Sequence, residues 1–296
     1  MNKQYTCLGL MSGTSGDGVD ASIIQSDGKD KVLLLKDKYY IYEDNIFSKF
    51  HNLKKKINFR RDLDKNINEI KELENKITIF HAKVIKDIIS NHKLDLVGFH
   101  GQTLYHNPLE KISFQIGNGN LLSQLSKKKI VFNFRKNDIL NGGEGAPLSP
   151  IYHQFLIKSK KINLPACVLN IGGISNLTLI KGYNNIDISS KDLGPGNCLL
   201  DKWIQANTNK NFDEDGKFSK SGEVNEIILE QALEIYENNI SKKKLKSYDT
   251  KDFDISFVRG LSIEDGAATL LSYTAKIIAS GISSVLREFE KDRINI

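Results

Sequence analysis

Two short apolar segments joined by a turn of small residues occur twice in this 296-residue chain. The first pair covers residues 5–11 and 19–24, and the turn between them is rich in glycine and serine. The second pair covers residues 166–171 and 174–180, with only two glycines between them. Strand, glycine turn and strand is the pattern of a β-hairpin. The repeat indicates that each half of the chain begins with a hairpin.

The segments after each hairpin complete an α/β pattern. Apolar residues at steps of three and four predict amphipathic helices over residues 66–90 and 264–290. Further strands are expected at residues 32–42, 94–99, 111–116 and 130–132, a loop at 192–197 and a helix at 198–206. The predicted apolar face of the last helix consists of Ala267, Leu271, Thr274, Ile278, Ile282, Val285 and Phe289. This order predicts two lobes, residues 1–128 and 129–296, with a ligand bound between them.

Charge and cysteine content narrow the class of protein. The net charge of +6 is spread along the chain and no lysine run exceeds three residues, so we do not expect nucleic-acid binding. Cys7, Cys167 and Cys198 cannot all pair, and we expect Cys7 and Cys167 to be buried free thiols in a reducing compartment. No segment approaches the roughly 18–20 apolar residues of a membrane span, which predicts a cytoplasmic protein without a membrane partner.

The first turn is a candidate phosphate site. Small residues between two strands allow backbone N–H groups to approach an anion, and Asp17 and Asp20 are candidates to hold a divalent cation. A plain hairpin turn favours the same residues and is an equal alternative. The segment is neither a P-loop nor a Rossmann glycine motif, because it has no G-x-x-x-x-G-K and a strand follows it. Gly172 and Gly173 have the same character, and the same alternative, in the second half.

Three further side chains are candidates for chemistry. Asp192 precedes a glycine-rich turn and a helix, which suits either a helix cap or a general base. His100 follows a strand, where ligands often bind, although a structural histidine is the commoner case. Arg135 suits a carboxylate or a phosphate, or an ordinary surface ion pair.

In combination, these segments resemble the anhydro-N-acetylmuramic acid kinase family. Eight motifs in family order span residues 9–197, and weaker similarity continues to the last helix. The motifs are Gly9-Leu10-Met11-Ser12-Gly13-Thr14-Ser15, Asp17-Gly18-Val19-Asp20, His100-Gly101-Gln102-Thr103, Gln115-Ile116-Gly117, Phe134-Arg135, Gly145-Ala146-Pro147-Leu148, Asn170-Ile171-Gly172-Gly173-Ile174-Ser175-Asn176 and Gly194-Pro195-Gly196-Asn197.

The resemblance implies a two-lobed, actin-like ATPase fold with ribonuclease H-like lobes, which binds ATP and Mg²⁺. It implies hydrolytic opening of 1,6-anhydro-N-acetylmuramic acid and phosphorylation of O6 during cell-wall recycling. Asp192 takes the position of the base that activates water. The expected cofactor-binding residues are Gly13, Thr14, Ser15, Gly16, Asp17, Gly18, Val19, Asp20, Gly172 and Gly173, with Asp17 and Asp20 at the metal. The expected sugar-binding residues are His100, Gln102, Thr103, Arg135, Gly194 and Asn197.

The sequence departs from the family pattern in several places. Gly16 and Leu193 replace a usual leucine and threonine, Asn118 and Asn133 replace aspartates, and Glu144 replaces a glutamine. Residues 292–296 are expected to begin a strand, after which the family's last glycine-rich turn is missing, so we expect an incomplete second lobe. Two alternatives stay open: a non-catalytic remnant that binds sugar or a partner, and an actin-like phosphotransferase for another sugar. A homodimer is also left open.

Overall fold

The computed structural model describes residues 3–13, 15–29, 31–90, 92–107, 110–239, 248 and 250–294. Contacts divide the chain into two compact units, Met1–Lys161 and Ile162–Ile296. This boundary lies further along the chain than the predicted one after residue 128. The reason is the short strand β6 (Ile130–Val131), which pairs with strand β4 (Leu96–Asn107) and so extends the first unit's sheet.

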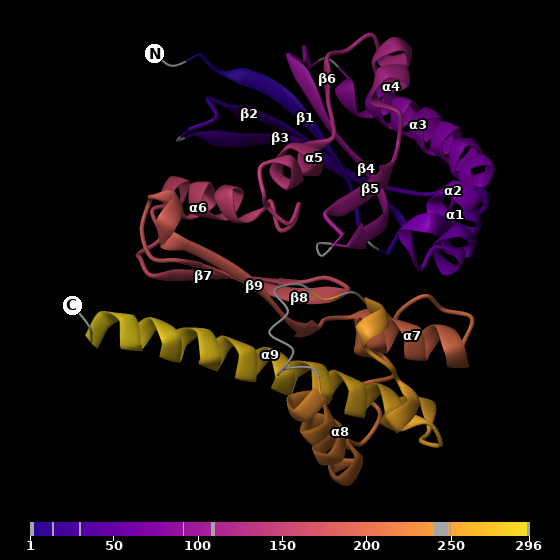
Figure 1. Cartoon of the computed structure of the whole chain (residues 1–296), viewed down its shortest axis with the longest axis vertical. Helices are drawn as coiled ribbons and strands as arrows, with labels where there is room; N and C mark the ends of the chain where they lie inside the picture. Colours follow the sequence, from indigo (N-terminus) through magenta and orange to yellow (C-terminus); the bar gives the residue numbers. More distant parts are fainter. Residues whose placement is uncertain are drawn as a thin grey trace. The chain divides into compact units, whose positions relative to one another are not determined.

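The first unit contains a mixed sheet in the order β3-β2-β1-β4-β5, with β6 beside β4. The remaining strands are β1 (Tyr5–Ser12), β2 (Gly18–Ser26), β3 (Val32–Ile41) and β5 (Ile112–Ile116). β1 and β2 are antiparallel, which confirms the first hairpin, and β1 runs parallel to β4. Figure 1 shows the sheet with its strand labels.

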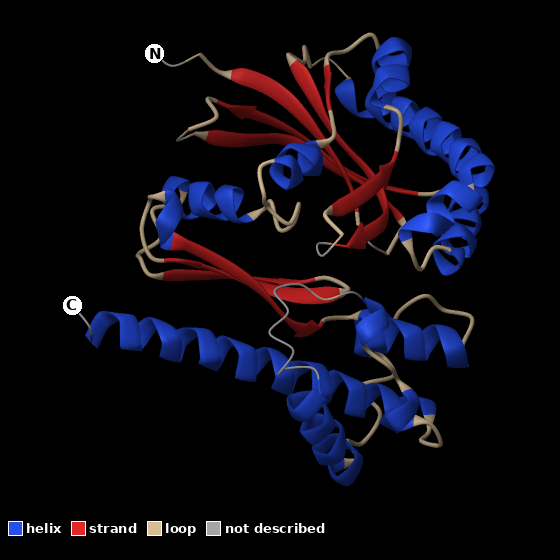
Figure 2. Ribbon diagram, in the orientation of Figure 1, coloured by secondary structure: helices blue, strands red, loops and turns tan. Residues whose placement is uncertain are grey.

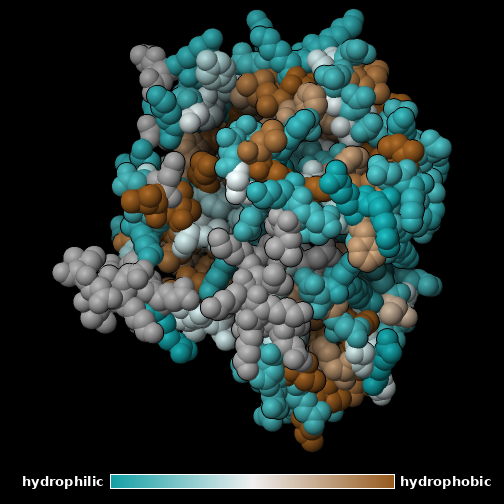
Figure 3. Space-filling model, in the orientation of Figure 1, coloured by the Kyte–Doolittle hydropathy of each residue, from teal (hydrophilic) through white to brown (hydrophobic). Residues whose placement is uncertain are grey.

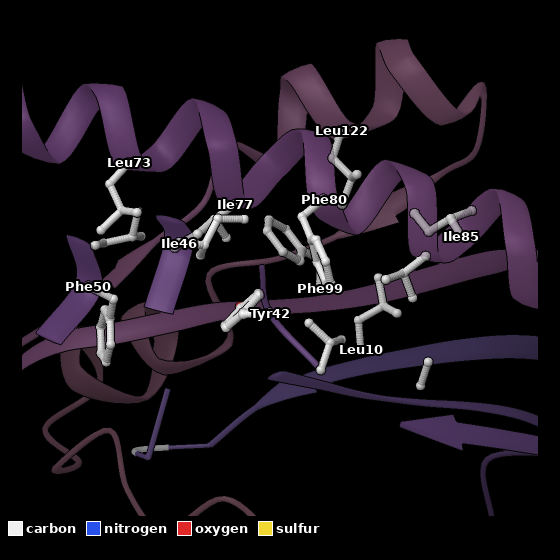
Figure 4. Packing of buried hydrophobic residues seen from close by; sticks show 14 of the residues in the cluster. Leu10, Tyr42, Ile46, Phe50, Leu73, Ile77, Phe80, Ile85, Phe99 and Leu122 are labelled. Carbon is white, nitrogen blue, oxygen red and sulfur yellow. The ribbon is translucent and has the colours of Figure 1, made fainter. Parts of the chain in front are cut away.

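Helices cover both faces of this sheet. They are α1 (Asp44–Lys56), α2 (Arg60–Lys65), α3 (Ile67–Ile89), α4 (Gly119–Ser126), α5 (Phe134–Leu140) and α6 (Pro150–Ser159). The predicted amphipathic helix is α3, which buries Ile70, Leu73 and Ile77 against the core. Figure 4 shows Leu73, Ile77, Phe80 and Ile85 on the side of the helix that faces the sheet, where Leu10 and Phe99 lie. Phe134 of α5 instead approaches Gly98 on the opposite face of β4.

The second unit is an antiparallel sheet in the order β7-β8-β9 with helices beside it (Figure 2). Its elements are β7 (Ala166–Ile171), β8 (Ile174–Ile180), β9 (Ile188–Pro195), α7 (Cys198–Asn207), α8 (Glu226–Asn239) and α9 (Ile263–Ile294). Short 3₁₀ turns lie at Asn185–Asp187, Glu214–Gly216, Thr250–Asp252 and Ser256–Val258. The β7–β8 ladder confirms the second hairpin.

Three predictions for the second unit are wrong. Residues 192–195 are not loop but the end of β9, because they pair with β8. Residues 292–294 continue α9 and do not start a strand. Cys167 is exposed on β7, where neighbouring side chains point to opposite faces of the sheet, whereas Cys7 is partly buried and Cys198 is buried.

α9 packs on β9, α7 and α8. Its buried face includes the predicted Ala267, Thr274, Ile278 and Val285. It also contains Leu270, Tyr273 and Ile277, whereas the predicted Leu271 is 46% exposed. The side chain of Phe289 lies outside the described residues.

By length and composition alone, one stretch of the described helices, Ile263–Arg287 in α9, is long and apolar enough to cross a membrane. Ala267 and Leu270 of this stretch belong to the hydrophobic core of the second unit. Figure 3 shows polar residues over much of the visible face, with apolar residues in separate groups.

Candidate functional site

The loop between β1 and β2 is a tight turn of small residues. The N–H of Gly16 donates to the carbonyl of Gly13 at 3.1 Å, and Ser15 Oγ donates to Asp17 Oδ1 at 2.6 Å. Thr14 lies outside the described residues. Gly16 has φ +65°, and a Cβ there would lie 2.3 Å from ring atoms of Phe50. Only glycine fits this position without movement of Phe50.

The two carboxylates near the loop have the charge that a cation requires. Asp17 receives hydrogen bonds from Ser15 and from the hydroxyl of Tyr39. Burial, and then the charge of Asp17, raise the pKa of Asp20 above its usual value. Mg²⁺ is commonly held by one or two carboxylates together with substrate phosphates, and this pair fits that pattern. The described residues contain no cluster of three or more acidic, histidine or cysteine side chains around one point.

A bulge in β4 shapes the neighbouring motif. Leu10 pairs with Phe99 but Ser12 pairs with Gln102, so one extra residue lies in β4 between them. Gly101 has φ +73°, and a Cβ there would lie 2.6 Å from the carbonyl oxygen of Ile116. The bulge leaves His100 on the face that carries α5 and turns the buried Gln102 toward the loop.

Gln102 contacts the loop directly. Its Nε2 donates to the carbonyl of Gly13 at 2.7 Å, and its side chain is 0% exposed. Its Oε1 has no hydrogen-bond partner among the described residues. Thr103 lies beside it and accepts from Gln115 Nε2 at 3.3 Å. Gln102, predicted to bind sugar, is therefore placed where it holds the start of the loop.

His100 and Arg135 are in contact. His100 Nδ1 faces the carbonyl of Gly101 at 2.8 Å, so Nδ1 carries the proton and Nε2 accepts from Arg135 Nε at 3.0 Å. Burial, followed by the charge of Arg135, lowers the pKa of His100 to about 4, so the ring is neutral. Arg135 Nη1 also donates to the carbonyl of Gly145 at 2.8 Å.

Asp20 of β2 and His100 of β4 lie on the same face of the first sheet. Val19 and Ala21 of β2 and Phe99 of β4 are buried beneath α3. Because side chains alternate along a strand, Asp20 and His100 point to the opposite face. Asp20, a predicted cation ligand, and His100, a predicted sugar contact, are therefore on the same side of the sheet, and Arg135 contacts His100 there.

Asp192 lies near the end of β9, opposite Asn176 of β8. The register shifts there, and the next residue, Leu193, packs against α9. By alternation, Asp192 points away from α9. Its Oδ2 accepts from the backbone N–H of Tyr248 at 2.8 Å, which is its sole hydrogen bond within the described part of the chain. Burial raises the pKa of this half-buried carboxyl to about 6.

The cap interpretation of Asp192 is wrong. α7 begins at Cys198 and its N-cap residue is Asn197, which is exposed. The N–H groups of Gly196 and Asn197 donate to the carbonyls of Gly173 and Gly172, at 3.0 and 2.8 Å. These bonds fasten the β7–β8 turn to the segment after β9. Gly194 is buried there, against Tyr236 and Ile277.

Two of the departures from the family pattern have local structural roles. Asn118 caps α4, with its Oδ1 accepting from the N–H of Leu121 at 2.9 Å. Asparagine and aspartate perform this role about equally well. Asn133 precedes α5 in the left-handed region, with φ +61°, which asparagine tolerates better than most residues.

Several neighbours of these groups were not predicted from the sequence. Tyr39 and Tyr42 lie in the predicted strand 32–42 but contact the loop, and Tyr248 contacts Asp192. These contacts join residues far apart in the chain, and no local pattern marks them. Phe50 belongs to α1, whose buried Ile46, Phe50 and Leu53 have the spacing of a helix face.

Comparisons with known proteins show which family the chain belongs to. The family described as anhydro-N-acetylmuramic acid kinase matches residues 5–294. The chain belongs to this family. It is similar to the anhydro-N-acetylmuramic acid kinase of Pelagibacter ubique (strain HTCC1062), with 55% identity over 100% of this chain and 79% of that protein. The kinase of the same name from Zymomonas mobilis is 37% identical over 93% of this chain and 76% of its own length.

Solved structures resemble the chain only weakly. The PPX-GPPA enzyme of Aquifex aeolicus has a TM-score of 0.31 and 12% identity, over 79% of this chain and 64% of that one. The ethanolamine utilization protein EutJ of Carboxydothermus hydrogenoformans has a TM-score of 0.32 and 10% identity, over 81% and 74%. The predicted α/β class with two units is confirmed by the structure.

Proposed function

We propose that three groups of residues carry out the reaction of this family: residues 13–20 bind ATP, His100 and Arg135 bind the sugar, and Asp192 activates water. The chain is a kinase that acts on anhydro-N-acetylmuramic acid in cell-wall recycling. Family similarity over the whole chain favours this enzyme over a non-catalytic remnant.

The raised pKa of Asp192 is the main observation in support of this proposal. A general base works best with a pKa near the working pH, and burial brings the pKa of Asp192 to about 6. Among the described residues, Tyr248 is the one hydrogen-bond donor to this carboxylate, at Oδ2, and Oδ1 is where we propose that the water molecule binds. An aspartate in a structural ion pair has its pKa lowered. The burial of Asp192 instead raises its pKa.

One base is enough to account for every proton in the reaction. Asp192 takes a proton from water as the water oxygen forms a bond to C1 of the sugar. The C1–O6 bond breaks, and O6 leaves with its electron pair. O6 forms a bond to the γ-phosphorus of ATP, the bond from γ-phosphorus to the bridging oxygen breaks, and ADP leaves. The proton on Asp192 then passes to solvent, and the product is N-acetylmuramic acid 6-phosphate.

The first loop supplies the nucleotide part of the proposal. The Gly13 carbonyl is held by Gln102 and by the N–H of Gly16, which fixes the direction of the neighbouring peptide groups. Fixed N–H groups stabilise phosphate oxygens at little reorganisation cost. Asp17 and Asp20 are the proposed holders of Mg²⁺, which when bound would neutralise charge on the transferring phosphoryl group. We further propose that Gly172 and Gly173 approach the nucleotide.

Arg135 and His100 supply the sugar part. Within the described residues Arg135 contacts no carboxylate; its partners are the neutral His100 and a backbone carbonyl. No described carboxylate therefore neutralises its positive charge, which suits the carboxylate of the sugar acid. Thr103, Gly194 and Asn197 remain proposed sugar contacts, and a cytoplasmic location is part of the proposal.

The test is ADP release by the purified chain, measured with ATP, Mg²⁺ and the anhydro sugar. We expect release that requires the anhydro sugar and yields the 6-phosphate. N-acetylmuramic acid, which has no anhydro bond, is the matched control and is expected to give far less release. Equal release from both sugars would contradict hydrolytic opening and favour the phosphotransferase with another sugar.

A further inference from the structure

A buried polar network lies directly beneath the first loop. Ser12 is the last residue of β1, Tyr42 follows β3, and His81 lies in the middle of α3. Their side chains are 2%, 3% and 0% exposed. Ser12 Oγ lies 3.0 Å from the hydroxyl of Tyr42 and 3.4 Å from His81 Nε2. None of the three is among the residues proposed above to bind ATP, the cation or the sugar.

The direction of these hydrogen bonds follows from His81. Its Nδ1 lies 2.8 Å from the carbonyl of Ile77, which only accepts, so Nδ1 carries the proton. Burial lowers the pKa of His81 to about 4, so the ring is neutral and Nε2 accepts. Ser12 therefore donates to His81, and the free lone pairs of Ser12 accept from Tyr42.

Tyr42 touches both ends of the loop. Its hydroxyl bonds to Ser12, immediately before Gly13, and its backbone N–H donates to the carbonyl of Asp17 at 2.8 Å. Its ring packs edge-to-face on Phe80 with 5.0 Å between centroids. Figure 4 shows this ring between α3 and the sheet. One fixed residue thus sets the distance between the two ends of the turn.

We infer that Tyr42, Ser12 and His81 are positioning residues that hold the phosphate loop in its binding conformation. This inference rests on the proposed role of residues 13–20. Apolar side chains of similar size would fill the same space without needing partners. A buried polar network is stable only in the arrangement that satisfies each member, so it specifies one conformation of the segments that it joins.

The test is the kinetics of Tyr42→Phe, which removes one hydroxyl and keeps the ring. Loss of one buried hydrogen bond corresponds to about two- to tenfold in an equilibrium constant. We expect kcat/KM for ATP to fall by that factor while KM for the anhydro sugar stays unchanged. Tyr40→Phe is the matched control, because the Tyr40 hydroxyl bonds to Asp87 in another part of the unit. We expect no change in that variant.

A second pair of variants separates positioning from stability. His81→Leu removes the acceptor, whereas His81→Gln retains an amide oxygen near the place of Nε2. We expect the glutamine to restore kcat/KM for ATP relative to the leucine. If Tyr42→Phe does not fold, Ser12→Ala tests the same hydrogen bond. Equal ATP kinetics in wild type, Tyr42→Phe and His81→Leu would overturn the inference, as would equal losses for ATP and sugar.

Gly13→Val distinguishes failure of this inference from failure of the loop assignment. If Gly13→Val weakens ATP binding while Tyr42→Phe does not, the loop binds phosphate and the network is not needed to position it. If neither variant changes ATP binding, the assignment of the loop itself is wrong. Isothermal titration with ATP and Mg²⁺ gives both results.

Discussion

Replacement of Asp192 by asparagine should inactivate the enzyme and stabilise its fold. Asparagine keeps the size of the side chain and an oxygen that can accept from Tyr248, but it cannot take a proton from water. Loss of a general base lowers the rate by roughly 10²–10⁴-fold. We expect this fall in sugar-dependent ADP release, with ATP affinity unchanged by titration calorimetry.

The stability change follows from the pKa of the same group. Burial raises the pKa of Asp192 to about 6 from an ordinary 3.8, so the ionised form opposes folding above pH 6. The difference corresponds to about 3 kcal/mol. Because the side chain is only half-buried, solvent screens part of this cost, and we expect about 1–2 kcal/mol at pH 8. A few degrees of added Tm should result.

The pH dependence of stability and activity tests whether burial of Asp192 is the cause of its raised pKa. Between pH 8 and 6 the difference in stability between the two proteins should stay nearly constant. As pH falls from 6 to 4, the native aspartate binds a proton that the unfolded chain does not, the cost disappears, and the two proteins should converge in stability. The wild-type kcat/KM should fall about tenfold per pH unit below pH 6, because the base is then protonated. Wild-type rates in Asp192→Asn would remove this residue from the mechanism. An inactive variant without added stability at pH 8 would refute burial as the cause of the raised pKa.

Three further substitutions test the first unit. Gly13→Val places a branched side chain where we propose that phosphate oxygens approach, so calorimetry should show weaker ATP binding with a small change in Tm. Unchanged binding would favour a plain hairpin turn. Gly16→Leu should destabilise by about 1–3 kcal/mol in urea unfolding, because φ is +65° and Phe50 occupies the space. Phe50 is fully buried, so Phe50→Ala is itself destabilising, but it should cost less stability in the Gly16→Leu variant than in the wild type. Arg135→Lys should raise KM for the sugar, because one amine cannot bond to both His100 and the Gly145 carbonyl. An unchanged KM would show that Arg135 is not part of the sugar site.

The sequence predicted the elements whose pattern is local. The β1–β2 and β7–β8 hairpins follow from apolar runs with glycine turns, and α3 follows from steps of three and four. α1 has the same kind of spacing in three buried residues, but charged residues surround them and obscure the pattern. Residues 192–195 resemble a loop in composition because they contain glycine and proline. Pairing with β8 overrides that preference.

The candidate site was predictable as motifs but not as an arrangement. Asp192, His100 and Arg135 could be named from the family resemblance, whereas their protonation and partners depend on burial. The Ser12 bonds join residues 30 and 69 positions apart, and Tyr248 lies 56 positions from Asp192. Such pairs leave no local signal in a single sequence. Tertiary packing alone brings them together.

The departures from the family pattern bear less on the chemistry than their number suggests. Asn118 retains a helix cap and Asn133 a left-handed turn, both of which are backbone roles. Leu193 packs with Leu177, Leu179 and Ile278, so its side chain lies on the face opposite to Asp192 and cannot position a water there. Gly16 has lost a side chain, but Phe50 fills the space beside it. The proposed base, the paired carboxylates and the uncompensated arginine are all retained, so we expect the family's chemistry to be retained with them.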